Sequence, residues 1–252
     1  MICGASGRKP RWETHSYWNI IMVVSHVIGH RSPRLLRQCE TLYMDGTFRS
    51  CPAPFEQLFT IIGHYHGRPV PLVNCLMEAR TIGHYRHVLQ LVKRHVRRVT
   101  GHRWRPATVI YNFELGLITA IETELPKAHV SGCFFHFTKS LWRRIQALKL
   151  SGPYRNDRHL EKCVQKVMAL SYLPLILVRN NFRQYTRSRA VRRLMNRYPT
   201  LREWLDYVRG TYIDGPFELV LWSLYQRNMD TQTNKNIESE YTVLPLVVMV
   251  GS

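Results

Sequence analysis

The order of short β-like and helical segments between Thr41 and Leu150 is the feature that most restricts the fold. Three runs rich in β-forming residues come first, and Gly67-Arg68 predicts a tight hairpin between the second and third. Three segments with helical spacing of apolar residues follow, and they alternate with two further short apolar runs. The strand candidates are Thr41–Phe48, Gln57–Tyr65, Pro69–Met77, Ala107–Tyr111 and His129–Phe135, and the helix candidates are His84–Val99, Glu114–Leu125 and Phe137–Leu150. This order predicts an α/β fold, in which helices flank a mixed sheet.

The alternation of strands and helices stops after Gly152, and only helical patterns follow. The expected helices there are Asp157–Ser171, Arg179–Tyr198, Glu203–Arg209 and Glu218–Leu224. A last helix is expected to begin near Asn234, and Pro245 limits it. We therefore divide the chain into a lead-in segment with a short helix (1–37), the first part of the α/β core (38–150), an α-helical insertion (151–225) and a final core helix that we expect to be truncated (226–252).

Positive charge dominates the composition. The chain has 36 Lys and Arg against 17 Asp and Glu, which gives a formal net charge of +19. Such an excess costs self-repulsion and favours a polyanionic partner. DNA is the first candidate, an anionic membrane surface is the second, and a basic protein without such a partner is the remaining alternative. The apolar runs Asn19–Gly29 and Thr242–Val250 are shorter than the roughly 20 residues of a membrane helix. We therefore expect no membrane partner.

Two of the expected helices are strongly basic. The helix at His84–Val99 carries a basic face opposite its apolar one (Arg86, Lys93, Arg94, Arg97 and Arg98). In the insertion, six arginines recur at helical spacing: Arg179, Arg183, Arg187, Arg192, Arg193 and Arg197. We expect these six to form a stripe that binds DNA phosphates, and a merely solvated face is the alternative.

One acid lies inside an apolar strand candidate. Asp45 stands in Tyr43-Met44-Asp45-Gly46-Thr47-Phe48, where a charge costs free energy unless something binds it. A metal ion is one such ligand. Because Asp-Gly is also a common turn pair, a turn acid before Gly46 is the alternative.

Six short motifs follow one another along the chain. They are Asp45-Gly46-Thr47-Phe48 with Cys51–Ile61 after it, Pro69–Val73, Val109–Glu114, Gly132–Phe137, Leu170–Pro174 and Thr233–Glu238. In this order they resemble the Mutator-like (MULE) transposase domain of the DDE transposases. Each motif alone is weak, but order and spacing are independent constraints. The resemblance runs from about Val27 to Tyr241, and it implies an RNase H-like mixed sheet flanked by helices, with an α-helical insertion before the last catalytic helix.

The resemblance also implies a chemistry, the two-metal phosphoryl transfer of DNA transposition. Asp45 would be the first metal ligand, Asn112 would hold the second position and Glu238 the third. The implied cofactor is Mg²⁺ or Mn²⁺. Two such ions about 4 Å apart need one carboxylate that bridges them and others that hold each ion.

Two residues depart from the family pattern. Asn112 stands where the family has Asp, and Tyr241 stands where it has His. An amide oxygen can ligate Mg²⁺ but carries no charge, so we expect impaired catalysis. Asn112 would also serve as a cap for the following helix. Glu114 and Glu240 are weak substitutes for the lost acid, since Glu114 more simply favours the dipole at its helix N-terminus.

Cys133 and His136 form the family's Cys-x-x-His segment. Together with His159 and Cys163 they would give four zinc ligands. The spacing matches no zinc pattern that we recognise, so a structural role is expected for Cys133 and His136, and zinc is not expected.

The leading prediction is a transposase-derived DNA-binding domain with impaired catalysis. The alternatives are an active DDE transposase or integrase, a non-enzymatic DNA-binding or domesticated regulatory factor, and a relic that does not fold stably. A degenerate or domesticated copy, or a partial gene model, is the simplest account of the departures. Scattered cysteines and the lack of a recognisable signal peptide predict an intracellular protein, and DNA transposition predicts the nucleus. The sequence leaves a homo-oligomer open.

Overall fold

A computed structural model of the chain describes residues 20–24, 32–47, 51–66, 68–225 and 227. Their contacts divide them into two compact units. Unit 1 takes the described residues up to Val109 together with Glu114–His129. Unit 2 takes Ile110–Phe113 and the described residues from Val130 onward. The boundaries predicted from the sequence (38–150 for the core, 151–225 for the insertion) stay a prediction.

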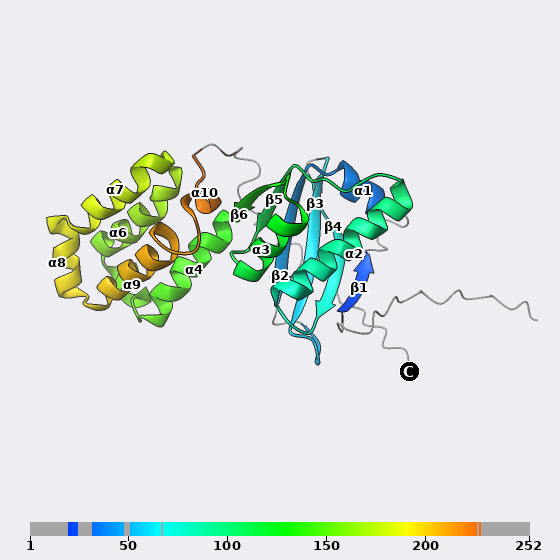
Figure 1. Cartoon of the computed structure of the whole chain (residues 1–252). Helices are drawn as coiled ribbons and strands as arrows, with labels where there is room; N and C mark the ends of the chain where they lie inside the picture. Colours follow the sequence, from blue (N-terminus) through cyan, green and yellow to red (C-terminus); the bar gives the residue numbers. More distant parts are fainter. Residues whose placement is uncertain (1–19, 25–31, 48–50, 67, 226, 228–252) are drawn as a thin grey trace, which may run out of the picture. The chain divides into compact units, whose positions relative to one another are not determined.

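The described strands form one sheet in the order β1-β4-β3-β2-β5-β6 (Figure 1). The pairs β1–β4, β4–β3 and β3–β2 are antiparallel. The strands are β1 (Ile20–Val24), β2 (Thr41–Thr47), β3 (Gln57–Tyr65), β4 (Arg68–Met77), β5 (Thr108–Tyr111) and β6 (His129–Gly132). The α/β class and the mixed sheet are therefore confirmed, and all five predicted strands are present.

The lead-in segment differs from its prediction, because it contributes a strand as well as a helix. β1 pairs along its whole length with β4, from Ile20 opposite Met77 to Val24 opposite Val73. So short an apolar run does not separate strand from helix by its periodicity. Pairing with β4 makes this run a strand, and β4 lies far from β1 in the sequence.

Unit 1 places its longest helix on one face of the sheet. Its helices are α1 (Ser32–Gln38), α2 (Ile82–Thr100) and α3 (Leu115–Glu124). α2 buries its predicted apolar stripe, and the ring of Tyr85 on it meets Phe59 of β3 edge-on at 5.4 Å. α3 packs on α2: the Cβ of a side chain at Gly116 would lie 3.6 Å from the backbone nitrogen of Ile82 and 3.7 Å from the ring of Tyr85. Neighbouring residues of a strand point to opposite faces, so Asp45 and Thr60 lie on the face away from α2.

Unit 2 is almost entirely helical. Its elements are α4 (Phe134–Ala147), α5 (Ser151–Asn156), α6 (Arg158–Met168), the 3₁₀ turn Ala169–Tyr172, α7 (Leu175–Thr186), α8 (Arg189–Arg197), α9 (Thr200–Val208), the π turn Arg209–Ile213 and α10 (Leu219–Trp222). Its core is aromatic: Phe137 stacks on Trp222 with ring centroids 4.9 Å apart, and Tyr212 meets Phe137 edge-on at the same distance. The helix expected near Asn234 lies outside the described residues.

Two boundaries in unit 2 differ from the sequence prediction. The expected helix Arg179–Tyr198 is two helices, because the Ser188 hydroxyl accepts from the N–H of Val191 and starts α8 anew. The expected strand His129–Phe135 ends at Gly132, and Phe134 already belongs to α4. The ring of Phe113 occupies the space where a side chain at position 132 would lie. The glycine therefore permits this packing.

Candidate functional site

Asp45 is a strand residue and not a turn acid. It pairs with Thr60 in the antiparallel register of β2 and β3, and Gly46 continues the strand opposite Phe59. One carboxylate oxygen of Asp45 accepts from the N–H of Gly46 at 2.8 Å. The side chain is half-buried. The turn alternative from the sequence is therefore wrong, and the acid stands inside the sheet as the metal-ligand hypothesis requires.

Polar side chains continue from Asp45 across the next two strands. Thr60 lies opposite Asp45, and Asn74 of β4 lies opposite Thr60. The Thr60 hydroxyl donates to the Asn74 side-chain oxygen at 3.1 Å. The three residues therefore form a polar row on the sheet face away from α2. Thr60 and Asn74 could not be predicted from the sequence, since only the strand register places them beside the acid.

The side chain of Glu114 was expected to interact with the dipole at the N-terminus of its helix, but the structure gives it another partner. It stands at the N-cap of α3, but its side chain makes no capping hydrogen bond. Its half-buried carboxylate instead accepts a hydrogen bond from the hydroxyl of Tyr85. Tyr85 is fully buried and also accepts from the Gln57 amide at 2.8 Å. A strand, the long helix and the start of α3 thus meet in one hydrogen-bonded group.

The charge of Glu114 is coupled to that of Asp45. Burial raises the pKa of Glu114, the Tyr85 hydrogen bond and the Arg80 charge oppose the rise, and the negative charge of Asp45 adds to it. Unit 1 therefore holds two carboxylates that interact electrostatically. Glu114 was predicted to be a weak substitute for the lost acid, and its coupling to Asp45 is the smallest of the four influences on its pKa.

The other two predicted metal-site positions are less fully described. Asn112 directly follows β5 and is half-buried. The N-cap of α3 is Glu114, so Asn112 does not hold that capping position. Asn112 belongs to unit 2, and Glu238 lies outside the described residues. The predicted convergence of Asp45, Asn112 and Glu238 therefore stays a prediction.

Residues 20–24, 32–47, 51–66, 68–225 and 227 contain no group of three or more His, Cys, Asp or Glu side chains that could hold a metal ion. Cys133 is buried at the N-cap of α4. Cys163 is buried on α6, where burial raises the pKa of its thiol and the neighbouring Tyr185 hydroxyl lowers it.

The six arginines of the predicted DNA-binding stripe divide into two groups. Arg197 contacts the buried carboxylate of Asp157 at 3.1 Å, and Arg179 contacts Asp214 at 3.4 Å as well as the carbonyl of Ile213. These two have structural partners. The other four are exposed and form no ion pair with any described residue: Arg183, Arg187, Arg192 and Arg193.

No helix in the described part of the chain is long and apolar enough to cross a membrane. Unit 1 thus combines a half-buried acid in a central strand with a sheet that helices flank. In agreement with this, residues 41–140 match the family model of the MULE transposase domain. The resemblance found in the sequence motifs is thereby confirmed over these residues, which include Asp45, Asn112 and Cys133. Comparisons with curated proteins and with solved structures gave no significant match.

Proposed function

We propose that this chain is a transposase-derived DNA-binding domain with an RNase H-like fold and impaired DNA-cleaving activity. The observation that carries the proposal is Asp45, a half-buried acid in a central strand of the segment that matches the MULE transposase domain. DNA transposition as the ancestral process implies the nucleus as the place of action.

The missing negative charge at position 112 is the proposed cause of the impairment. In this proposal Asp45 and Glu238 hold Mg²⁺ or Mn²⁺, and Asn112 lacks the charge of the family's second Asp. When bound, two such ions supply an activated water or DNA 3′-hydroxyl and stabilise the leaving oxygen. The described residues fit this requirement only in part, since Asp45 supplies a carboxylate and Asn112 supplies an uncharged amide.

A second candidate function, an active DDE transposase, is favoured by one observation. The Glu114 carboxylate is electrostatically coupled to Asp45, and a displaced acid could restore the charge that Asn112 lacks. Against it, the hydrogen bond from Tyr85 holds that carboxylate in a structural role.

DNA binding is tested by measuring the affinity of the full chain for a labelled duplex over a range of salt concentrations. If the arginines of α7 and α8 bind phosphates, the affinity falls with salt at a log–log slope of roughly −0.9 per phosphate contacted. Reversing the charge of Arg192 and Arg193 should weaken binding to all sequences alike, because phosphate contacts carry no sequence information. A salt-independent affinity, or none, would overturn the proposal.

A further inference from the structure

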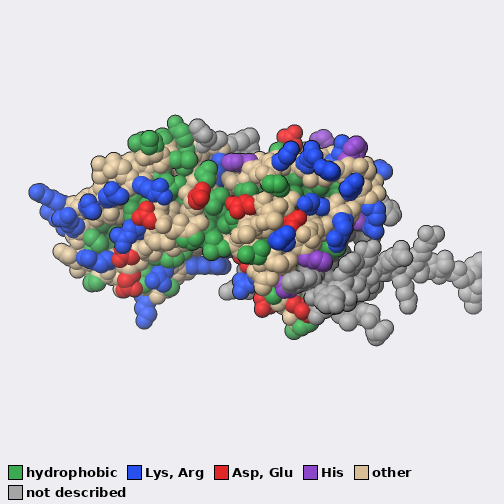
Figure 2. All heavy atoms as spheres, viewed as in Figure 1, with side chains coloured by type: hydrophobic (Ala, Val, Ile, Leu, Met, Phe, Trp, Pro, Cys, Tyr) green, Lys and Arg blue, Asp and Glu red, His purple; other side chains and the backbone are tan. Residues whose placement is uncertain are grey.

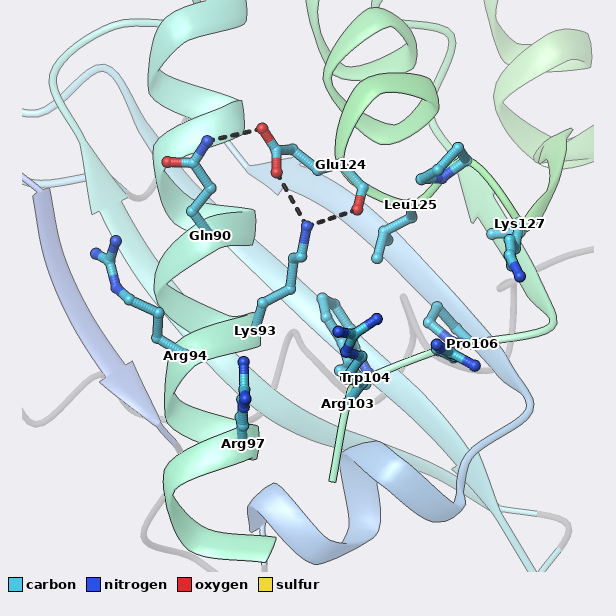
Figure 3. A pocket seen from close by; sticks show the side chains of 13 residues that line it. Gln90, Lys93, Arg94, Arg97, Arg103, Trp104, Pro106, Glu124, Leu125 and Lys127 are labelled. Carbon is cyan, nitrogen blue, oxygen red and sulfur yellow. Dashed lines mark hydrogen bonds and ion pairs between the residues drawn. The ribbon is translucent and has the colours of Figure 1, made fainter. Parts of the chain in front are cut away.

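The strongest feature outside the Asp45 site is a basic pocket of about 500 Å³ in unit 1 (Figure 3). It lies between the C-terminal half of α2, the chain that follows α2, and the end of α3. Figure 2 shows Lys and Arg side chains gathered over the part of unit 1 in which α2 lies. Six cations line this α2 basic pocket: Lys93, Arg94, Arg97, Arg103, Arg105 and Lys127.

The local sequence explains why cations from two segments meet. α2 ends at Gly101, whose left-handed conformation (φ 74°) turns the chain, and whose N–H donates to the carbonyl of Arg97. Beyond this turn, burial alternates: Trp104 and Pro106 are buried, whereas Arg103 and Arg105 are exposed. The indole N–H of Trp104 donates to the carbonyl of Leu36 at 3.1 Å and anchors the segment. Figure 3 shows Arg103 on this segment and Arg97 on α2.

Glu124 is the single acid that lines the pocket, and other groups already neutralise it. Its buried carboxylate accepts from Arg86 at 3.0 Å, Gln90 at 2.7 Å and Lys93 at 3.1 Å. Burial raises the pKa of Glu124, but these hydrogen bonds outweigh it and leave the pKa lowered. Glu124 therefore stays ionised, ties α3 to α2, and fixes Lys93 at the pocket wall.

The other five cations of the pocket form no ion pair with any residue in the described ranges. They are Arg94, Arg97, Arg103, Arg105 and Lys127. Like charges held in one concave site repel one another unless an anion joins them. Four of the five are arginines, whose planar guanidinium matches a phosphate group with two parallel hydrogen bonds. An anion is therefore the ligand that suits this pocket, and phosphate fits best.

We propose that the α2 basic pocket binds the phosphate backbone of double-stranded DNA. The inference rests on the proposed function and adds a contact region in unit 1 to the arginines of α7 and α8. A duplex is favoured over a single strand because the pocket offers no aromatic face for base stacking. The one aromatic residue that lines it, Trp104, is 4% exposed.

The test compares two triple variants of the full chain. One carries Arg97→Gln, Arg103→Gln and Arg105→Gln. The control carries Arg155→Gln, Lys162→Gln and Arg202→Gln, which remove the same charge from exposed positions outside the pocket. We expect the pocket variant to bind a labelled duplex about tenfold more weakly at low salt. Its log–log salt slope should be shallower by roughly 0.9 for each phosphate that the variant no longer neutralises. The control should change far less.

A second measurement does not depend on variant folding. In the native chain, a bound duplex should protect Arg97, Arg103 and Arg105 from an arginine-modifying reagent, with Arg155 and Arg202 as internal references. Equal weakening in both triple variants, or no selective protection, would overturn the inference while leaving DNA binding intact. Absence of duplex binding by the native chain would overturn the proposed function as well. A pocket variant that binds anionic lipid vesicles more weakly, but DNA as before, would show that the pocket serves a membrane and would also overturn the inference.

Discussion

The carboxylate of Glu114 accepts a hydrogen bond from the hydroxyl of Tyr85 and does not cap the helix that begins beside it. Because the Tyr85 oxygen also accepts from the Gln57 amide at 2.8 Å, this one hydroxyl connects β3, α2 and the start of α3. This hydrogen bond connects the core of unit 1 to Glu114, the acid that lies nearest in the sequence to Asn112.

We expect Tyr85→Phe to destabilise the fold. The change removes the Tyr85 hydroxyl from the buried Gln57 amide, which keeps only its contact with the Met77 sulfur, and removes a donor from Glu114. We expect a cost of about 1–3 kcal/mol in the free energy of unfolding. Denaturant unfolding measures the loss. Tyr154→Phe is the matched control, because the Tyr154 ring packs against Trp142 and its hydroxyl bonds no described residue. Equal stability of the two variants would contradict the hydrogen-bonded group.

Glu114→Gln should alter how stability depends on pH. The pKa of Glu114 is raised in the folded protein, so the folded state holds the proton more tightly than the unfolded state. The stability that the bound proton contributes is then fully present below the pKa that Glu114 has in the unfolded chain. It is lost as pH rises through the pKa that Glu114 has in the folded protein. The Gln side chain does not ionise, so the variant does not lose this stability at high pH. We therefore expect its melting temperature to exceed that of the native chain at pH 7 by roughly 2 °C.

The difference between Glu114→Gln and the native chain should shrink as pH falls to the unfolded pKa of the carboxyl group. Thermal melts across this pH range provide the measurement. A Gln variant that is less stable at pH 7 would show that the ionised carboxylate contributes more than its burial costs.

Asn112→Asp should restore metal-dependent chemistry if the missing charge is the cause of impairment. We expect Mn²⁺-dependent nicking of a DNA duplex to rise on the order of tenfold to a hundredfold over the native chain, because correct metal placement has effects of this size. The Mn²⁺-induced rise in melting temperature should also be larger in the variant. Robust cleavage by the native chain, abolished by Asp45→Ala, would instead establish an active transposase.

Asp157→Asn should loosen unit 2 in a pH-dependent way. The backbone N–H of His159 holds the pKa of Asp157 below its usual range, and Tyr198 and Arg197 add to the effect against the cost of burial. A lowered pKa contributes stability that is present above the unfolded pKa and lost as pH falls through the folded pKa. We expect a lower melting temperature at pH 7 and no difference in strong acid. Asp206→Asn, at an exposed pair with Arg209, is the control.

The sequence by itself determined the α/β class, the positions of the five core strands and the Asp45 motif. Their signals are local, since a strand or helix shows its periodicity within its own residues. The α2 basic face was also visible, but its pocket was not. That pocket needs Gly101 to turn the chain and Trp104 to anchor it, so that Arg103 and Arg105 return beside Arg97.

Only the tertiary structure decided the relationships between residues far apart in the chain. It made a strand of Ile20–Val24 by pairing it with β4, and it placed Thr60 and Asn74 in a row with Asp45 through the strand register. It also paired Arg197 with Asp157, a buried acid of the same unit that lies 40 residues away in the sequence. Such pairings depend on which surfaces pack together, and no spacing within a single segment encodes that choice.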